Sequence, residues 1–275
     1  MQDTGAFKLR GATNAFLSLS HDKRACGEIG VLTGNHGRGV AYAARVLGIT
    51  CCVYMSELVP AVKIDAIRAL GAEIVITGCS QDDAEVEAMR RIERDGLTYI
   101  HPFDDPHVIA GQGTIGLEIL EDMPDVANVI VPLSGGGLFC GIATAVKSMK
   151  PSARLSGITM ENGAAMIDSL NAGQPVPVEE TESLADSLGG GIGLDNAYTF
   201  DTTQRYIDDT LRISEAEIAA AMKTLFLEDR IVAEGGGAVG VGALLSGRLP
   251  LDPGPTAIVI SGCNVDMQRF LDIVG

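Results

Sequence analysis

The sequence predicts an α/β protein in which helices cover parallel sheets. Short apolar runs rich in β-branched residues alternate with longer segments of helical periodicity along the chain, and this alternation is typical of parallel sheets with helical crossovers. The composition agrees, because 46% of the 275 residues are hydrophobic and 34 are glycines, which suit tight turns between strands and helices. A chain of this length buries enough surface for one large domain or two modest ones.

In the first half of the chain, apolar runs and helical periods alternate from residue 51 onward. Gly71 is expected to stop one helix, and Ser80 with Asp83 three residues later is expected to open the next. The expected elements are, in order, a strand over 51–55, a helix over 59–70, a strand over 73–77, a helix over 80–94 and a strand over 98–101.

The second half of the chain repeats this rhythm. Ser214 and Glu217 form the capping-box pattern of a helix start. No linker rich in Pro, Gly or Ser and no repeat interrupts the chain, so we expect one α/β protein with a subdomain over 27–104. The expected elements are a helix over 114–121, a strand over 128–133, a helix over 138–149, a strand over 154–160, helices over 214–228 and 237–245, and a strand over 256–260.

Charge and cysteine usage exclude several classes of function. The net charge of −16 leaves no basic excess to neutralise phosphates, which argues against nucleic acid or an anionic membrane as a partner. The six cysteines are scattered without a C-x-x-C pair and there are only four histidines, so no zinc pattern appears and the thiols are expected to be reduced. The sequence contains neither an apolar run of membrane-spanning length nor a signal-peptide pattern.

Two segments in the first part of the chain contain residue types that carry chemistry. Lys8 lies in TGAFKLRGA (4–12), among small residues, and a lysine held in a pocket that lowers its pKa becomes a nucleophile. Asn35 lies in TGNHGRG (33–39), a loop that can present backbone amides to an anion. Taken alone, each has an ordinary explanation as a solvated charge or a strand-to-helix turn.

Two further segments follow predicted strands in the second part of the chain. SGGGL (134–138) leads directly into a helix, where successive amides and the helix dipole favour a phosphate. SGCN (261–264) follows the last strand, and the carboxyl ends of parallel strands are where α/β sheets place ligands. Gly235, Gly237 and Gly240 also spell G-x-G-x-x-G, but they follow a helical segment, so a dinucleotide site is not expected.

Taken in order, TGAFKLRGA, TGNHG, SGGGL and SGCN resemble the fold-type-II pyridoxal-phosphate enzymes of the serine/threonine dehydratase family. The stretches 101–119 and 184–194 resemble that family too, so the likeness spans nearly the whole chain. The run SQDDAE resembles the hydroxyectoine-utilisation dehydratase branch. The resemblance implies a tryptophan synthase β-like fold with two three-layer α/β/α domains. It assigns 1–26 and 105–275 to a larger domain that binds pyridoxal phosphate, and 27–104 to a smaller one.

The resemblance also implies a role for each residue that matches a family motif. Lys8 would hold the cofactor covalently and later act as the α-proton base, while Ser261 would face the pyridine nitrogen. A serine there leaves the ring nitrogen largely unprotonated, which favours prompt β-elimination. The remaining expected contacts are Asn35 to the ring 3-hydroxyl; Ser134, Gly135, Gly136, Gly137 and Leu138 to the phosphate; and Thr33, Gly34, Asn35 and His36 to the substrate carboxylate.

Three departures from the family pattern qualify these expectations. Thr33, the second expected catalytic residue, stands where racemising relatives carry serine, which favours dehydration over racemisation. Glu161 matches the first of two acidic cation ligands, but the second position is Ile167, with Asp168 one step out of register. No bound metal is therefore expected. Family members carry a few dozen residues before the lysine motif, so the resemblance implies a truncated or misassigned start.

The expected function is that of a pyridoxal-phosphate dependent dehydratase, or ammonia-lyase, that converts threonine, serine or a similar β-hydroxy amino acid to a 2-oxo acid and ammonia. The alternatives are an inactive truncated relative with a structural or interaction role, a serine racemase or hydroxyaspartate dehydratase variant of the same fold, and a nucleotide-dependent oxidoreductase. The family resemblance further implies a homodimer in the cytoplasm.

Overall fold

The computed structural model describes residues 2–26, 28–31, 34–57, 59, 61–79 and 81–275. The chain divides into two compact units, Met1–Gly111 and Gln112–Gly275. Each contains a four-stranded sheet in which all paired strands run parallel. The predicted α/β class with parallel sheets is therefore confirmed. The predicted assignment of 1–26 to the larger domain stays a prediction.

The first unit has the strand order β3-β2-β1-β4. Its strands are β1 (Glu28–Val31), β2 (Cys51–Met55), β3 (Glu73–Ile76) and β4 (Thr98–Tyr99). Its helices are α1 (Lys8–Ser18), α2 (His21–Cys26), α3 (Asn35–Leu47), α4 (Ala61–Arg68), α5 (Gln81–Asp95) and the start of α6 (Pro106–Asp122).

Strand β2 explains why helices cover both faces of this sheet. All five of its residues are buried, and successive side chains of a strand point to opposite faces. Cys51, Val53 and Met55 belong to a cluster with residues of α1, α3 and α4. Cys52 and Tyr54 pack with Ala84 and Ala88 of α5. The run CCVYM is therefore a central strand that is buried on two faces, as its continuous apolar character predicts.

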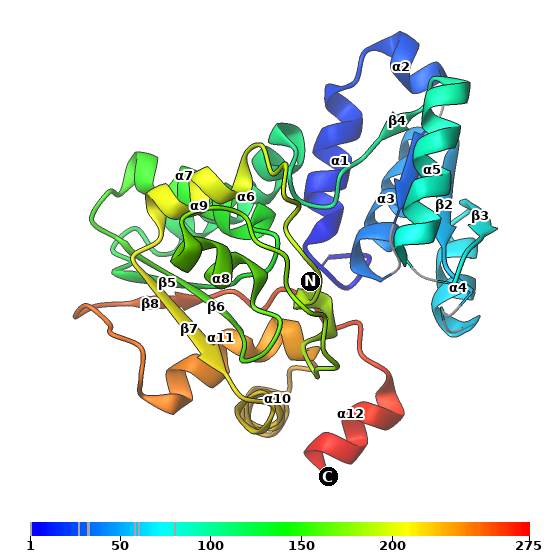
Figure 1. Ribbon diagram of the computed structural model, residues 1–275. Coiled ribbons are helices and arrows are strands. Elements are labelled where there is room, and N and C mark those ends of the chain that lie inside the picture. The colour runs from blue at the N-terminus through cyan, green and yellow to red at the C-terminus, as the bar shows by residue number, and fades with distance from the viewer. Residues whose placement is uncertain (1, 27, 32–33, 58, 60, 80) are drawn as a thin grey trace. The chain divides into compact units, whose positions relative to one another are not determined.

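The second unit has the strand order β7-β6-β5-β8. In Figure 1, α7 and α9 lie on one side of this sheet and α10 and α11 on the other. Its strands are β5 (Asn128–Pro132), β6 (Arg154–Met160), β7 (Asp209–Ile213) and β8 (Thr256–Ile258). Its helices are α7 (Gly137–Met149), α8 (Ala165–Ala172), the short 3-10 helix η1 (Asp186–Leu188), α9 (Thr199–Tyr206), α10 (Glu215–Asp229), α11 (Gly235–Ser246) and α12 (Met267–Val274).

Strands β5 and β8 are neighbours, and this brings two of the sequence motifs to one edge of the sheet. Ile130 pairs with Ile258 in register, and the Val259 amide donates to the Ile130 carbonyl at 3.0 Å. Ser134 and Ser261 each follow one of these two parallel strands. The carboxyl edge of the sheet therefore carries both motifs, as expected for a ligand site in an α/β fold.

Two predicted strands and one predicted helix start agree with the structure residue for residue. The strands predicted over 51–55 and 154–160 are β2 and β6 with the same bounds, and the capping box of Ser214 and Glu217 is present at the start of α10. Helix α6 begins at Pro106, earlier than predicted, and its first amides donate to the Asp105 carboxylate. Ser80 lies outside the described residues. Among the described helices, none combines the length and apolar character needed to cross a membrane.

Candidate active site

Lys8 begins helix α1 in the first unit, and its amine is held inside that unit. The Lys8 Nζ donates a hydrogen bond to the Pro102 carbonyl at 2.6 Å. Burial lowers the pKa of Lys8 from 10.5 to about 8, because desolvation disfavours the charged ammonium. The side chain nevertheless keeps partial exposure. A lysine with these properties has a substantial neutral fraction near neutral pH and is a usable nucleophile.

Two glycines let other backbones approach the start of α1 closely. A Cβ added to Gly39 of α3 would lie 3.1 Å from the Leu9 amide nitrogen. A Cβ added to Gly111 of α6 would lie 2.6 Å from the Arg10 carbonyl, closer than real Cβ contacts come. The lysine is therefore carried by a helix start that is embedded among backbones, which fixes where its Cα lies.

Residues of the TGNHG motif form the start of α3 in the same unit. Gly34 precedes the helix with a φ of 78°, a conformation that glycine adopts without strain. His36 is buried, and its Nε2 lies 2.8 Å from the Ile100 carbonyl. Burial, with the Lys8 charge as the second cause, lowers the pKa of His36 to about 3, so the imidazole is neutral. Thr33 lies outside the described residues.

The carbonyls that hold Lys8 and His36 are two residues apart in one segment. Ile100 and Pro102 follow β4, and the segment is braced by His101, whose Nδ1 accepts from the Asp104 amide at 2.7 Å. The structure thus brings together Lys8 and His36, as their electrostatic coupling also indicates. These two carbonyls were not among the site residues predicted from the sequence.

The SGGGL motif in the second unit forms the turn from β5 into α7. Gly136 has a φ of 90°, and a Cβ there would lie 2.8 Å from the Met166 Cε. The first hydrogen bond of α7 runs from the Cys140 amide to the Gly136 carbonyl at 2.8 Å. The amides at Gly137, Leu138 and Phe139 therefore lie in the first turn, where a helix supplies no backbone acceptor. Such a turn attracts an anion.

Ser261 lies in the same unit, at the same edge of the sheet, and it is buried, with 7% of its surface exposed. The segment that follows it is attached to the start of α11. The Glu234 amide donates to the Gly262 carbonyl at 3.1 Å, and the Glu234 carboxylate accepts from the Asn264 amide at 3.1 Å. Sequence reasoning missed Glu234. Its one local signal is an acidic residue directly before three glycines at a helix start.

The glycines of the G-x-G-x-x-G pattern serve close packing. A Cβ on Gly235 would lie 2.1 Å from the Leu184 carbonyl, and one on Gly237 would lie 2.7 Å from the Gly262 carbonyl. A Cβ on Gly240 would lie 2.8 Å from Ile258 Cγ2. Each glycine therefore makes room for a neighbouring segment, which gives the pattern a structural reason other than dinucleotide binding.

Two acidic residues, Glu161 and Asp168, were considered as cation ligands in the sequence. Asp168 Oδ1 accepts from the Arg212 guanidinium at 2.5 Å, and Glu161 is exposed. Within the described ranges, no group of three or more His, Cys, Asp or Glu residues gathers as a metal site would require. The expectation about a metal remains a prediction.

A comparison with protein families identifies the chain. The family model described as pyridoxal-phosphate dependent enzyme matches residues 1–262. The chain belongs to this family. The resemblance stated from the motifs is thereby confirmed, as is pyridoxal phosphate as the cofactor of the family.

Similar proteins place the chain within the serine/threonine dehydratase group. It is 53% identical to a putative threonine dehydratase of Sinorhizobium fredii over 273 residues, covering 99% of this chain and 82% of that protein. It is 44% identical to the L-threonine ammonia-lyase of Thermotoga maritima, covering 100% of this chain and 68% of that protein. The solved structure of maize serine racemase matches with a TM-score of 0.92 at 31% identity, covering 98% of this chain and 83% of that one.

The residues of each unit fit the family's cofactor. In the first unit, a partly buried lysine with a lowered pKa suits an aldehyde. In the second unit, the glycine turn at the start of α7 suits a phosphate, because the amides of Gly137, Leu138 and Phe139 lie in the first turn, where the helix supplies no backbone acceptor. Ser261 supplies a neutral hydroxyl at the same sheet edge. Each unit taken by itself therefore offers groups of the kind that a phosphorylated pyridine aldehyde binds.

Proposed function

We propose that this chain is a pyridoxal-phosphate dependent ammonia-lyase that converts L-threonine or L-serine to a 2-oxo acid and ammonia. The α-proton and the β-hydroxyl group of the substrate are eliminated as water. One water molecule is then consumed when the released product hydrolyses to the 2-oxo acid and ammonia. The proposal rests on the family, on the names of the relatives and above all on Lys8. That residue combines a lowered pKa with a defined place at the start of α1.

Lys8 has two tasks in this proposal. Its neutral Nζ is the nucleophile that attaches the cofactor, and it later accepts the α-proton of the substrate. Bound pyridoxal phosphate supplies the electron sink that makes this proton acidic. The Pro102 carbonyl, 2.6 Å from the Nζ, offers an acceptor for the ammonium once the lysine carries the proton. Desolvation keeps the pKa near 8, so the same amine both accepts and returns a proton at neutral pH.

The other assignments follow from the chemistry of the groups. We assign the cofactor phosphate to Ser134, Leu138 and the glycine amides, because a chain of net charge −16 offers few cations for it. We assign Ser261 to the pyridine nitrogen, where a hydroxyl can donate a hydrogen bond without placing a full charge on the ring. Asn35 is assigned to the ring 3-hydroxyl, and the turn of Gly34, Asn35 and His36 with Thr33 to the substrate carboxylate.

A racemase is the second candidate, because the fold is similar to that of maize serine racemase. Racemisation needs an acid and a base on opposite faces of the substrate. The residue before Gly34 is threonine, whose extra methyl group restricts its hydroxyl, so dehydration remains the favoured activity. Chiral chromatography of L-serine incubated with the holoenzyme distinguishes the two, since a racemase accumulates D-serine.

We further propose that the enzyme is a cytoplasmic homodimer with an amino acid as its substrate and with neither nucleic acid nor membrane as a partner. The strong negative charge supports the exclusion of polyanions. The described Cys52 and Cys79 are free thiols, as suits a reducing compartment. Sedimentation of the holoenzyme measures its mass directly.

The deciding experiment is an absorbance spectrum of the purified chain with added pyridoxal phosphate, followed by an assay for 2-oxo acid with L-threonine and L-serine. The parent is expected to develop a band near the visible edge and to release 2-oxo acid. Lys8→Ala should do neither, whereas Lys23→Ala, at an exposed lysine of the same unit, should do both. A well-folded parent without the band would overturn the proposal.

A further inference from the structure

Glu234 is a buried acidic residue at the start of α11 to which the roles above assign no task. It precedes the helix in an extended conformation, with φ −71° and ψ 160°, and only 6% of the residue is exposed. Removing a carboxylate from water is costly unless hydrogen bonds replace those of the solvent. The partners that provide this compensation therefore indicate what the residue is attached to.

The two carboxylate oxygens of Glu234 contact two different segments of the second unit. Its Oε2 accepts from the Asn264 amide at 3.1 Å. Its Oε1 accepts from the Ser187 hydroxyl at 3.4 Å. Its own amide donates to the Gly262 carbonyl at 3.1 Å. One residue thus attaches the segment Ser261–Asn264 and the helix η1 (Asp186–Leu188) to the first turn of α11.

Glycines in that first turn allow both segments to pack closely against α11. A Cβ on Gly236 would lie 2.3 Å from the Ser187 Oγ, and one on Gly237 would lie 2.7 Å from the Gly262 carbonyl. Backbone packed this closely has one arrangement, and a hydrogen bond to a buried charge at the same place fixes it. The position of Ser261, three residues before Asn264, depends on this attachment.

We propose that Glu234 is a positioning residue for the cofactor: it holds the Ser261–Asn264 segment so that the Ser261 hydroxyl meets the pyridine nitrogen. The inference rests on the proposed function. Glu234 acts through the Asn264 amide, so its effect comes from geometry. The hydrogen bond from the Ser187 hydroxyl helps to hold the Glu234 carboxylate in this place.

The test compares Glu234→Ala with a conservative variant and a matched control. Glu234→Gln keeps the length of the side chain, an oxygen for the Asn264 amide and an amide group that can donate to Ser187. Glu215→Ala removes another carboxylate that holds the same stretch, since Glu215 accepts from Ser183 Oγ at 2.6 Å and from the Leu184 amide at 2.7 Å. Among the described residues, Glu215 contacts Ser183 and Leu184 and not the Ser261 segment, which is what the control requires.

The readouts are the dissociation constant and absorbance spectrum of pyridoxal phosphate, kcat and KM, and amide hydrogen exchange over 262–264 without cofactor. Glu234→Ala is expected to weaken cofactor binding on the order of tenfold, as the loss of a buried charge-assisted hydrogen bond implies, to change the spectrum and to speed exchange. Glu234→Gln should restore all three to within about threefold of the parent, and Glu215→Ala should leave the cofactor spectrum unchanged.

Several outcomes overturn the inference. One is a folded Glu234→Ala variant that keeps the parent's spectrum, cofactor affinity and hydrogen exchange. Another is a Glu234→Gln variant that is as impaired as Glu234→Ala. The third is a Glu215→Ala variant that changes the spectrum as much as Glu234→Ala does. If Glu234→Ala does not fold, Glu234→Asp replaces it, because retraction by one methylene should shift the spectrum without removing the charge. A parent that lacks the band fails the proposed function instead, and the exchange measurement then still decides whether Glu234 holds the segment.

Discussion

At the level of single residues, burial acts in the same direction on two basic groups of the first unit. Lys8 and His36 are each held by a backbone carbonyl, of Pro102 and Ile100 respectively. A carbonyl accepts a hydrogen bond from a neutral or a charged donor, so it compensates only part of the lost hydration of a cation. The pKa of both groups is therefore lowered, to about 8 for Lys8 and about 3 for His36. Each shift gives a measurable pH dependence.

Attachment of pyridoxal phosphate to the apoprotein should accelerate as the pH rises through about 8 and level off above it. The neutral amine is the nucleophile, and an ordinary lysine would give a midpoint near 10.5. Stopped-flow absorbance over this pH range measures the rate, with Nα-acetyl-lysine as the reference amine. Lys8→Arg should give no band at any pH, and a midpoint equal to that of the reference amine would contradict the lowered pKa.

The buried His36 should make the folded protein sensitive to acid. The unfolded chain takes up a proton at this residue below about pH 6.5, whereas the folded protein does so only near 3. Unfolding therefore becomes more favourable as the pH falls through this window, by up to about 1.4 kcal/mol for each pH unit. In His36→Gln, the free energy of unfolding by urea should fall less steeply between pH 6 and about pH 4.5 than in the parent. His21→Gln is the control, since the His21 side chain is 99% exposed.

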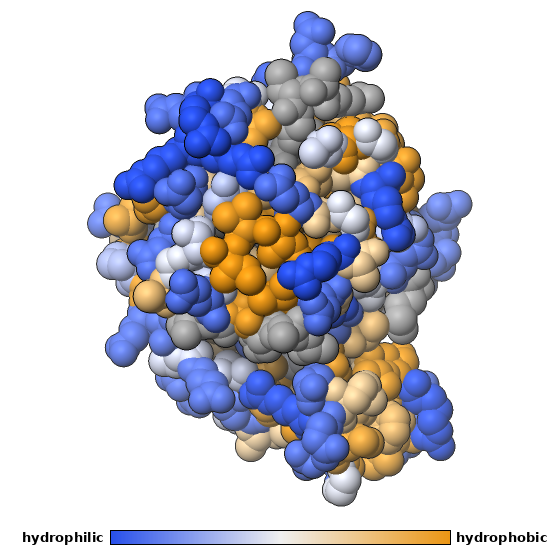
Figure 2. Space-filling model, turned by 90° about the vertical axis from the view of Figure 1, so that its right-hand side faces the viewer, coloured by the Kyte–Doolittle hydropathy of each residue, from blue (hydrophilic) through white to orange (hydrophobic). Residues whose placement is uncertain are grey.

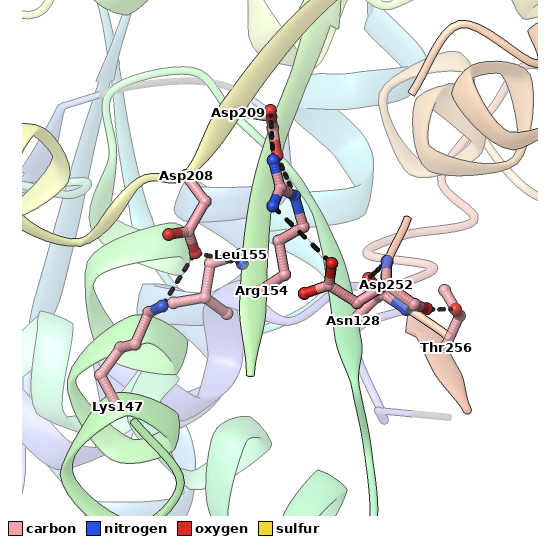
Figure 3. Close-up of polar contacts among 8 residues, drawn as sticks. All are labelled: Asn128, Lys147, Arg154, Leu155, Asp208, Asp209, Asp252 and Thr256. Atoms are coloured by element: carbon pink, nitrogen blue, oxygen red, sulfur yellow. Dashed lines mark hydrogen bonds and ion pairs between the residues drawn. The ribbon is translucent and has the colours of Figure 1, made fainter. Parts of the chain in front are cut away.

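At the level of elements, the amino ends of the strands in the second unit are joined by polar contacts (Figure 3). Arg154 at the start of β6 binds Asp209 at the start of β7 through two hydrogen bonds of 2.5 and 3.0 Å. Asn128 at the start of β5 donates to Thr256 Oγ1 of β8 at 3.1 Å. This network lies at the opposite ends of the strands from Ser134 and Ser261. It therefore orders the sheet that positions those residues.

Arg154→Met should lower the free energy of unfolding of the second unit by about 1–2 kcal/mol, because it leaves the mostly buried Asp209 carboxylate without its bidentate partner. Urea denaturation followed by circular dichroism measures this loss. Arg248→Met is the control in the same unit. Arg248 is 49% exposed, and its partner Glu217 keeps the hydrogen bonds to Ser214. Its cost should stay below about 1 kcal/mol, and equal losses for the two variants would contradict the argument.

Helices and strands were predictable from the sequence where the pattern of their own residues determines the structure. The continuous apolar run CCVYM gave β2 with the correct bounds, because a strand buried on both faces needs no polar alternation. The first half of α6 was missed, since glycines at 111 and 113 interrupt its pattern. Gly111 is required there by the close approach of the Arg10 carbonyl, a contact with a distant part of the chain. Strand β7 was also missed, because only Ile213 of its five residues is buried.

In the candidate site, too, the local residues could be predicted from the sequence and their distant contacts could not. The identities of Lys8, Asn35, Ser134 and Ser261 are contained in local motifs, and the family match supports the motifs that carry them. Their supports are not local. The Pro102 carbonyl that holds Lys8 is 94 residues away in sequence, and Glu234 lies 30 residues before Asn264. A carbonyl has no residue-specific signature, so no pattern in one sequence reveals such a contact.

At the level of the whole molecule, one face combines an edge strand with exposed apolar side chains. Strand β3 ends the sheet order of the first unit, and its Ile76 is 47% exposed. Val86 and Met89 of helix α5 are 51% and 46% exposed. Figure 2 views the side of Figure 1 that carries β3, α4 and α5, and shows an apolar patch surrounded by hydrophilic side chains. An edge strand with unpaired backbone groups and apolar side chains promotes association between chains.

Ile76→Lys should therefore reduce association at high protein concentration. A lysine on an edge strand disfavours pairing with a second strand, because its charge would have to be desolvated there. The substitution replaces a half-exposed side chain, so the free energy of unfolding should change by less than about 0.5 kcal/mol. Light scattering over a concentration series measures the weight-average mass. Leu245→Lys, at a residue of α11 that is 56% exposed, controls for the added charge alone. If both variants lower the mass equally, net charge and not the β3 edge governs association.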